Sequence, residues 1–205
     1  MYIVFIYERV EWINTILEML WPNLGLRVRE VIYGVIEPDI QKSLEQYGMS
    51  GFSFEKVSLG QIPPRITGIK VYDKKSTRNQ IIIDVDLLYT SDCDITISLK
   101  GWSSGLQGIR FRGTLRIELK SLINEAPFFE SVEAYFLTTP EFDFSLGGIA
   151  NIFDVTGVSG LLRTVLMEIL ANYMVFPNTL KLIENEVGEF NLLKSYGIHN
   201  EKHKI

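Results

Sequence analysis

The sequence lacks most of the residues on which catalytic and metal sites depend. It contains a single cysteine, Cys93, so no disulfide can form within the chain, as suits a reducing compartment. Its only histidines, His199 and His203, lie close to the C-terminal end, so the preceding residues offer no imidazole for a catalytic triad or a zinc site. We therefore expect no catalytic residue, no metal and no cofactor. An enzyme such as a lipid hydrolase is the least favoured function.

Long apolar runs and an excess of basic residues are also missing. No apolar run reaches the roughly 20 residues of a membrane-spanning helix. The net charge of −5 and the pI of about 5.2 argue against a nucleic-acid partner. Nevertheless, 46% of the residues are hydrophobic and the mean hydropathy is +0.13. In a chain of 205 residues, enough for one domain or two at most, this excess predicts either a generous core or an apolar cavity.

The N-terminal half of the chain begins with a helical pattern. Apolar residues recur at helical spacing over residues 11–20 and again over residues 24–36. We expect Pro22 to kink or restart this helix, and Pro38 either to close it or to open a last turn. The apolar stripe needs a partner surface, and a sheet is the available one. Residues 1–7 (MYIVFIY) are interpreted as a strand or helix lead-in, or as the end of a membrane anchor.

The central residues 80–119 contain three runs in which apolar and polar residues alternate. This period of two predicts antiparallel strands with one dry and one wet face. Weaker strand patterns occur at 52–59, 66–72, 132–136 and 142–146, and a second helix is predicted at 159–173. We expect a flexible loop at 101–108, one helical turn at 121–129, a short helix at 149–153 and a linker or frayed tail after residue 183. The order of these elements is typical of an α+β fold.

Charged residues near the central strands allow two interpretations. Asp84, Asp86, Asp92 and Asp94 resemble a metal cluster only loosely, because they lack the wrapped spacing of a calcium loop. Pairing of Asp84 and Asp86 with arginines across the sheet is the stronger expectation. The arginines at 110, 112 and 116, with Lys100 nearby, either attract anionic headgroups or form a solvated face balanced by these carboxylates.

The predicted loop at 101–108 carries two large apolar residues, Trp102 and Leu106. Exposed apolar residues at a loop tip sometimes enter a membrane surface. A Trp tucked against the protein is the commoner arrangement, and both interpretations remain open at this stage.

Many short segments together resemble one known family. They are ERVEWIN at 8–14, WP at 21–22, VIEP at 35–38, FSF at 52–54, GQ at 60–61, PRI at 64–66, GIKVY at 68–72, QIIID at 80–84, GTLR at 113–116, DV at 154–155 with Gly157, and NYMVFPN at 172–178. The chain resembles the SMP domain of the extended synaptotagmins, within the tubular lipid-binding (TULIP) superfamily. The resemblance covers residues 8–182, between a lead-in at 1–7 and a tail at 183–205.

The resemblance implies both a fold and a function. SMP domains combine a long kinked helix, a strongly curved antiparallel sheet and C-terminal helices into an open tube with an apolar lining. They bind glycerophospholipids by the acyl chains, form homodimers, and transfer lipids between the endoplasmic reticulum and the plasma membrane at contact sites on the cytosolic face. Family members also carry a membrane hairpin and C2 domains. The residues after 182 do not resemble the usual run into a C2 domain, so the resemblance does not extend tethering or calcium control to them.

Two functions therefore remain in view: a lipid carrier, or a dimeric spacer module at contact sites without cargo. For the carrier, we predict that the dry faces of the helices and strands line the groove. The predicted lipid-binding residues are Val28, Ile32, Val35, Ile36, Ile81, Ile83, Val85, Leu87, Ile95, Ile97, Leu99, Phe111, Leu115, Ile117, Ile152, Phe153, Leu162, Leu166 and Ile169.

Overall fold

The computed structural model describes residues 10–72, 79–147, 157–184 and 190–195. The chain divides into two compact units: unit 1 comprises Met1–Gly68, Asp86–Gly113 and Pro140–Ile169, and unit 2 comprises Ile69–Val85, Thr114–Thr139 and Leu170–Ile205. Four elements pass from one unit into the other: β2 (Arg65–Tyr72), β3 (Gln80–Thr90), β5 (Trp102–Leu122) and α5 (Val158–Met174).

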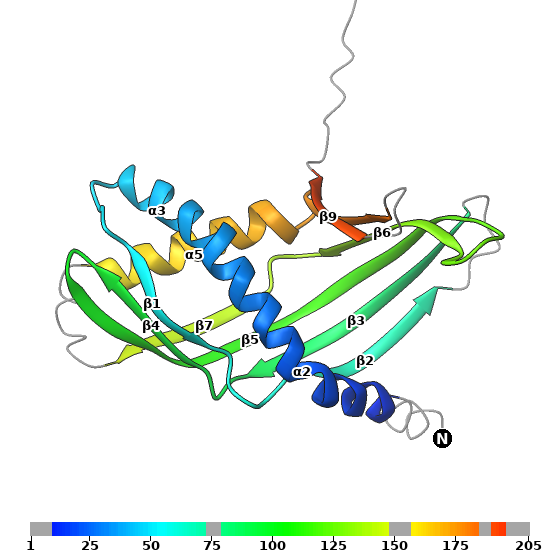
Figure 1. The fold of residues 1–205 in the computed structure, drawn as a ribbon, viewed down its shortest axis with the longest axis horizontal. Helices are drawn as coiled ribbons and strands as arrows, with labels where there is room; N and C mark the ends of the chain where they lie inside the picture. Colours follow the sequence, from blue (N-terminus) through cyan, green and yellow to red (C-terminus); the bar gives the residue numbers. More distant parts are fainter. Residues whose placement is uncertain (1–9, 73–78, 148–156, 185–189, 196–205) are drawn as a thin grey trace, which may run out of the picture. The chain divides into compact units, whose positions relative to one another are not determined.

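The strands of the described residues belong to one sheet of nine strands (Figure 1). Its path runs β1-β4-β5-β6-β8-β9, with β3 and β7 also paired to β5, and β2 paired to β3. The remaining strands are β1 (Ser53–Ser58), β4 (Asp94–Leu99), β6 (Phe129–Phe136), β7 (Glu141–Gly147), β8 (Thr179–Glu184) and β9 (Phe190–Ser195). The pairings along this path, and the pairing of β7 with β5, are antiparallel. One helix precedes the strands in the sequence, and α5 lies between β7 and β8. The predicted α+β class is therefore confirmed.

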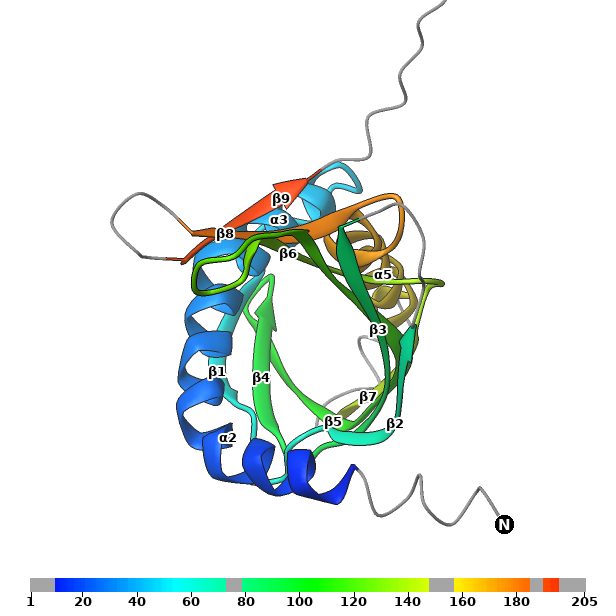
Figure 2. The same ribbon diagram turned by 90° about the vertical axis from the view of Figure 1, so that its right-hand side faces the viewer.

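The N-terminal helix is continuous and has three parts: α2 (Glu11–Val31), η1 (Ile32–Ile36) and α3 (Glu37–Glu45). Figure 2 shows this helix beside β1. The expected restart at Pro22 is wrong, because α2 continues through this residue. Pro22 and Glu18 are both exposed, so the Glu18 carbonyl that loses its helical donor can bond to water instead. The irregularity lies at η1, a π-helical segment. Pro38 lies in the first turn of α3, so of its two predicted roles the opening of a last helical segment is confirmed and the closing of the helix is not.

Helices α2 and α3 differ in how they are held. Two buried residues of α2 anchor it by polar contacts: Asn14 exchanges two hydrogen bonds with the backbone of Ile66 (2.8 and 3.0 Å), and the Trp21 indole donates to the Gly60 carbonyl. In α3, Ile40 and Leu44 are fully buried. The expectation that the whole apolar stripe packs on the sheet is therefore wrong for much of α2, whose apolar side chains are largely exposed.

The glycine-rich stretch at 101–108 is a strand, and its prediction as a loop is wrong. Lys100 and Gly101 form the two-residue turn between β4 and β5, with φ values of 53° and 81° that suit a tight hairpin. Strand β5 begins at Trp102 and pairs with β4 from Leu99↔Trp102 to Ile95↔Leu106. Gly108 (φ 61°) falls where the β5–β7 register shifts between Gln107 and Arg110, which marks a β-bulge.

Strands β6 and β7 occur where the sequence predicts strands, whereas β8 and β9 were not predicted. Helix α5 occupies the predicted position. Residues 123–128 form the turn of the β5–β6 hairpin and contain no helix, because Leu122 already pairs with Phe129 across it. The expected tail contributes β9, which pairs with β8 along its whole length. The lead-in at 1–7 and the short helix expected at 149–153 lie outside the described residues.

Candidate functional site

Unit 1 contains an apolar cavity of about 240 Å³. Its lining draws on the N-terminal helix, on the five strands β1, β3, β4, β5 and β7, and on α5, and it includes no charged side chain. The lining residues are Ile32, Ile36, Phe52, Phe54, Leu59, Tyr89, Cys93, Ile95, Ile97, Leu106, Ile109, Phe111, Phe142, Leu162 and Leu166.

The helical side of the cavity is formed at η1, the π-helical segment. Ile32 and Ile36 both line the cavity, and the Glu37 N–H bonds back to the Ile32 carbonyl across this wider turn. The Glu37 carboxylate accepts a hydrogen bond from the backbone N–H of Phe54 (2.8 Å). This bond ties the end of the π-helical segment to β1, so the two walls of the cavity are held together.

Residues of β5 that precede the bulge and residues that follow it line the same cavity. Leu106 and Ile109 are three residues apart, so in a regular strand they would point to opposite faces. Both are buried and both line the cavity, because the register shift between Gln107 and Arg110 reverses the alternation of side chains between them. Phe111 then follows Ile109 at the regular spacing.

Helix α5 closes another side of the cavity with Leu162 and Leu166, one turn apart. Arg163 anchors this helix to β7: its guanidinium donates to the Asp143 carboxylate (2.6 Å) and to the Phe144 carbonyl (2.7 Å). The hydrogen bond from Arg163 holds the pKa of Asp143 below its usual range. Because both side chains are substantially exposed, we expect this ion pair to add little stability, and its contribution is mainly orientation.

The cavity lining contains two side chains with a polar group, the hydroxyl of Tyr89 and the thiol of Cys93. The Tyr89 hydroxyl donates to the Leu59 carbonyl (3.1 Å), and burial raises the pKa of Tyr89 to about 12. Tyr89 therefore stays neutral at physiological pH. Cys93 is a free thiol, which behaves as a small apolar group. The cavity accordingly suits an apolar ligand that makes no specific polar contact there.

The structure brings together seven of the residues predicted to line a groove: Ile32, Ile36, Ile95, Ile97, Phe111, Leu162 and Leu166. Five more lie in unit 1 outside the cavity lining: Val28 and Val35 are exposed, Leu87 is half-buried, and Leu99 and Ile169 are buried. Five lie in unit 2: Ile81, Ile83, Val85, Leu115 and Ile117. Ile152 and Phe153 lie outside the described residues.

Sequence reasoning missed more than half of the lining. Tyr89 and Ile109 continue alternating patterns that were recognised, so periodicity alone would have included them. Leu106 was expected in a loop, with insertion into a membrane as one of two interpretations, and insertion is wrong for Leu106 because its side chain is buried in the cavity wall. Trp102, at the start of the same strand, is exposed. The other missed residues are Phe52, Phe54, Leu59, Cys93 and Phe142, which lie in mixed or interrupted patterns.

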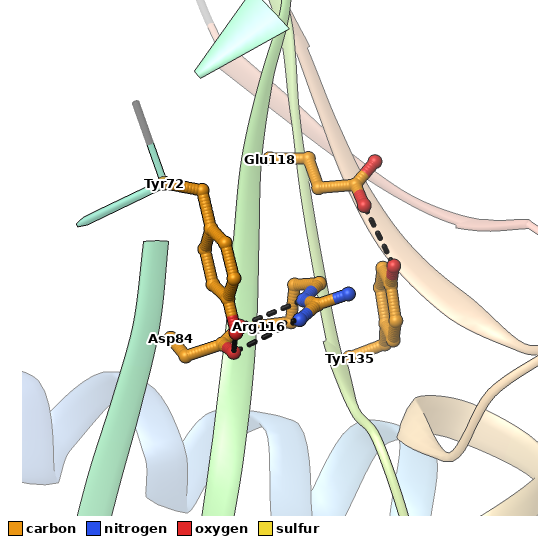
Figure 3. A network of polar contacts seen from close by, with 5 residues as sticks. All are labelled: Tyr72, Asp84, Arg116, Glu118 and Tyr135. Carbon is orange, nitrogen blue, oxygen red and sulfur yellow. Dashed lines mark hydrogen bonds and ion pairs between the residues drawn. The ribbon is translucent and has the colours of Figure 1, made fainter. Parts of the chain in front are cut away.

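Unit 2 contains a polar network on one face of its strands (Figure 3). Arg116 binds Asp84 through two hydrogen bonds (2.7 and 2.9 Å), and the Tyr72 hydroxyl donates to the same carboxylate (2.7 Å). The hydrogen bond from Arg116 is the main reason that the pKa of Asp84 lies below its usual value. Beside it, Tyr135 donates to Glu118, and burial raises the pKa of Tyr135 to about 12.

This network decides between the interpretations of the charged residues. Asp84 pairs with Arg116 as predicted, while Asp94 pairs with Lys56. The Asp92 carboxylate accepts hydrogen bonds from the backbone N–H groups of Gln61 and Ile62, which lower its pKa. Within the described residues, no three potential metal-ligating side chains gather in one place.

The arginines of β5 are balanced by carboxylates, which favours the solvated-face interpretation over a headgroup-binding row. Arg110 lies opposite Asp143 and Arg112 opposite Glu141 in the β5–β7 pairing, while Arg116 binds Asp84. Opposite charges across neighbouring strands stabilise a sheet.

Comparison with known proteins identifies the family. The model of the synaptotagmin-like mitochondrial-lipid-binding domain (SMP_LBD) matches residues 6–183. The chain belongs to this SMP family. It is 34% identical over 173 residues to extended synaptotagmin-2 of Homo sapiens and 33% identical over 172 residues to extended synaptotagmin-3 of Xenopus tropicalis. Each match covers 83% of this chain and 19% of the relative, so the chain spans about a fifth of these proteins.

Solved structures agree with the assignment to the SMP family. A structure of extended synaptotagmin-2 that contains its SMP domain and two C2 domains matches with a TM-score of 0.70 and 32% identity, over 86% of this chain and 39% of that one. The crystal structure of Mmm1 matches with a TM-score of 0.57 and 11% identity, over 96% of this chain and 89% of that one, and supports the fold alone. Among the described residues of this SMP domain, no helix has both the length and the apolar character needed to cross a membrane.

Proposed function

We propose that this SMP domain is a lipid carrier that binds glycerophospholipids by their acyl chains and moves them between membranes. The observation that supports the proposal is the cavity in unit 1, whose lining is apolar throughout and whose one hydroxyl is already bonded to the backbone. A ligand in this cavity is selected by apolar contact. The headgroup would remain in water, so we expect little selection among headgroups.

The energy of lipid transfer explains why such a lining is needed. Exposing one methylene group to water costs about 0.8 kcal/mol, so one sixteen-carbon chain costs roughly 12 kcal/mol. A protein that removes a lipid from a bilayer must offset most of this cost with apolar contacts. The cavity in unit 1 supplies part of the required contact area without any catalytic group.

The cavity is smaller than the pockets of about 300–1,000 Å³ that enclose drug-sized ligands. It therefore accommodates part of an acyl chain. We propose that the apolar side chains next to it on the same helix, Val28 and Val35, extend the contact surface. In unit 1 we also keep the predicted residues Leu87, Leu99 and Ile169 as proposed lipid contacts. The predicted residues Ile81, Ile83, Val85, Leu115 and Ile117 of unit 2, and Ile152 and Phe153, remain separate proposals for contact with lipid.

The cellular setting of the proposal follows from the extended synaptotagmins. We propose that residues 8–182 act as a homodimer, without enzyme activity, on the cytosolic side of the endoplasmic reticulum where it meets the plasma membrane. The alternative is a dimeric spacer that carries no lipid. The two proposals differ in whether the purified domain contains lipid.

Native mass spectrometry with lipid extraction tests the carrier proposal directly. We expect glycerophospholipids bound to the wild-type domain, and a well-folded, lipid-free protein would favour the spacer. Ile36→Trp and Leu166→Trp fill the cavity from two helices at half-buried positions. Both should reduce bound lipid, while Met19→Trp, at an exposed position of α2 outside the cavity, should not. Normal lipid content in both folded variants would contradict the assignment of this cavity.

A further inference from the structure

The turn between β5 and β6 in unit 2 presents apolar side chains to solvent. We call residues 123–128 the β5–β6 tip. Phe128 is 61% exposed and Ile123 is 38% exposed, and they lie at the two ends of this short turn. The Ile123 N–H donates to the Phe128 carbonyl (3.1 Å), and the Phe128 N–H donates to the Glu125 carbonyl (2.6 Å). These two bonds close the tip, so Ile123 and Phe128 are neighbours across the turn.

The backbone of the tip is held in an unfavourable conformation. Phe128 has φ 72° and Ser121, just before the tip, has φ 55°. A bulky residue at positive φ is a true outlier, because Gly or Asn adopts this region at far lower cost. Such strain persists only where the surrounding structure enforces it, and it is concentrated at functional positions. A large apolar side chain that is both strained and exposed adds nothing evident to folding.

Contacts below the tip keep it in place. The Asn79 side-chain amide donates to the Leu122 carbonyl (2.5 Å), and the Leu122 N–H donates to the Asn79 carbonyl (3.2 Å). Further along the hairpin, Lys120 bridges Glu133 and Glu118 (2.5 and 3.4 Å). A turn fixed in this way loses little conformational entropy when it binds, which favours insertion without refolding.

We propose that the β5–β6 tip inserts Ile123 and Phe128 into the interfacial region of a phospholipid bilayer. This inference rests on the proposed carrier function, because a carrier must touch the membrane from which it takes lipid. A lipid surface fits better than a protein partner, since a stable protein interface buries about 1,200–2,000 Å² and this tip offers a few side chains on a turn. Phe, like Trp and Leu, is a common apolar side chain of structures that lie in the interface between membrane and water.

The charges of the tip define the type of lipid surface. Glu125 lies within it and Glu130 follows it, and both are exposed. Residues 123–128 contain no lysine or arginine. Binding by the tip therefore depends on apolar insertion and needs no anionic lipid, so vesicles of phosphatidylcholine are the appropriate probe.

Vesicle flotation with three matched variants tests the inference. Ile123→Gln combined with Phe128→Asn removes both apolar groups, and Asn tolerates positive φ, so the variant should fold at least as well as the wild type. We expect its partition onto phosphatidylcholine vesicles to fall by about tenfold or more. Phe128→Trp should retain binding. Phe176→Asn changes an equally exposed Phe (61%) of the same unit and should also retain it.

Bound lipid, measured by mass spectrometry, separates this inference from the carrier proposal. The double substitution leaves the cavity unchanged, so once it is loaded the double variant should hold as much lipid as the wild type while losing vesicle binding. Unchanged flotation of the folded double variant would overturn the inference. Loss of dimer with unchanged flotation would also overturn it and assign the tip to a second copy of the chain. A wild-type domain without lipid would refute the carrier proposal, and flotation would still report on the tip.

Discussion

The guanidinium of Arg116 donates two hydrogen bonds to the carboxylate of Asp84, from Nε to Oδ1 (2.7 Å) and from Nη2 to Oδ2 (2.9 Å). Both side chains are mostly shielded from water, and Tyr72 occupies the remaining side of the carboxylate. Because residues of a strand alternate, Leu115 and Ile117 lie on the opposite face of β5 from Arg116. The pair therefore stabilises three strands of unit 2 from the polar face of the sheet.

Removing the charge of Asp84 should destabilise the protein. Asp84→Asn leaves the Arg116 guanidinium without its anion in a largely buried position, and we expect a loss of about 1–3 kcal/mol in the free energy of unfolding. Urea denaturation measures this loss. The matched control is Asp94→Asn, which breaks the exposed pair with Lys56 and should cost less than about 1 kcal/mol. Equal losses in the two variants would argue against a special role for the shielded pair.

The same pair predicts a dependence of stability on acid. The pKa of Asp84 is lower in the folded protein than the value of about 3.9 expected when unfolded. Its contribution is therefore complete above the unfolded pKa and is lost as pH falls through the lower folded pKa. Asp92 and Asp143 have lowered pKa values too, so the wild type should lose stability below about pH 4 through several groups.

Asp84→Asn isolates the contribution of Asp84 to this pH dependence. The difference in unfolding free energy between wild type and variant should be constant near neutral pH and shrink in acid. A difference that grows as the pH falls would contradict the assignment.

Gly60 is expected to tolerate no side chain. A Cβ at this position would meet the Asp92 side chain at 2.0 Å and its backbone carbonyl carbon at 2.8 Å, and its φ of 73° already disfavours other residues. Gly60→Ala should therefore displace Asp92 from the N–H groups of Gln61 and Ile62. Gly101→Ala provides the comparison, because Gly101 has φ 81° with open space around its Cβ. Thermal unfolding should show a clearly larger loss for Gly60→Ala, and similar losses would mean that backbone strain alone determines the effect.

Cys93 offers a chemical reporter for the occupancy of the cavity. Its thiol lines the cavity, so a bound acyl chain should shield it from a maleimide reagent. We expect labelling of lipid-loaded protein to be several-fold slower than labelling of protein stripped of lipid, as followed by intact mass. In a Cys93→Ser background, Ser50→Cys places a thiol at an exposed position, and its labelling rate should not depend on lipid. Equal rates at Cys93 with and without lipid would place the ligand elsewhere.

Periodicity predicted the elements whose sides differ in polarity. Strands β3 and β4 lie within residues 80–119, where alternation of apolar and polar residues predicted strands, and α5 is longer than the predicted helix at 159–173 by one residue at each end. Pro22 and the glycines at 101–108 gave misleading signals. Helix α2 continues through the exposed Pro22, where water can bond to the carbonyl that loses its helical donor, and glycine in a bulged strand resembles glycine in a loop.

The cavity was predictable only in part, because its lining depends on tertiary contacts. The chosen residues Ile95, Ile97, Leu162 and Leu166 line it, since their elements are regular. Phe52 and Leu59 lie at the edges of β1, where no repeating pattern exists. Leu106 lies beyond the bulge from Ile109, and a one-residue change of register cannot be recognised from alternation alone.

The π-helical segment η1 determines how far the apolar side of α3 is rotated about the helix axis relative to the apolar side of α2. Its turn holds one residue more than an α-helical turn, and one residue corresponds to a rotation of about 100° around the helix axis. The extra residue lets one unbroken rod present an open apolar side along α2 and a buried one at Ile40 and Leu44. In a family member with one residue fewer here, the burial of α3 and the lining of the cavity by Ile32 and Ile36 could not both be kept. Chain length across residues 32–36 is therefore expected to be more constrained than the identity of the residues within them.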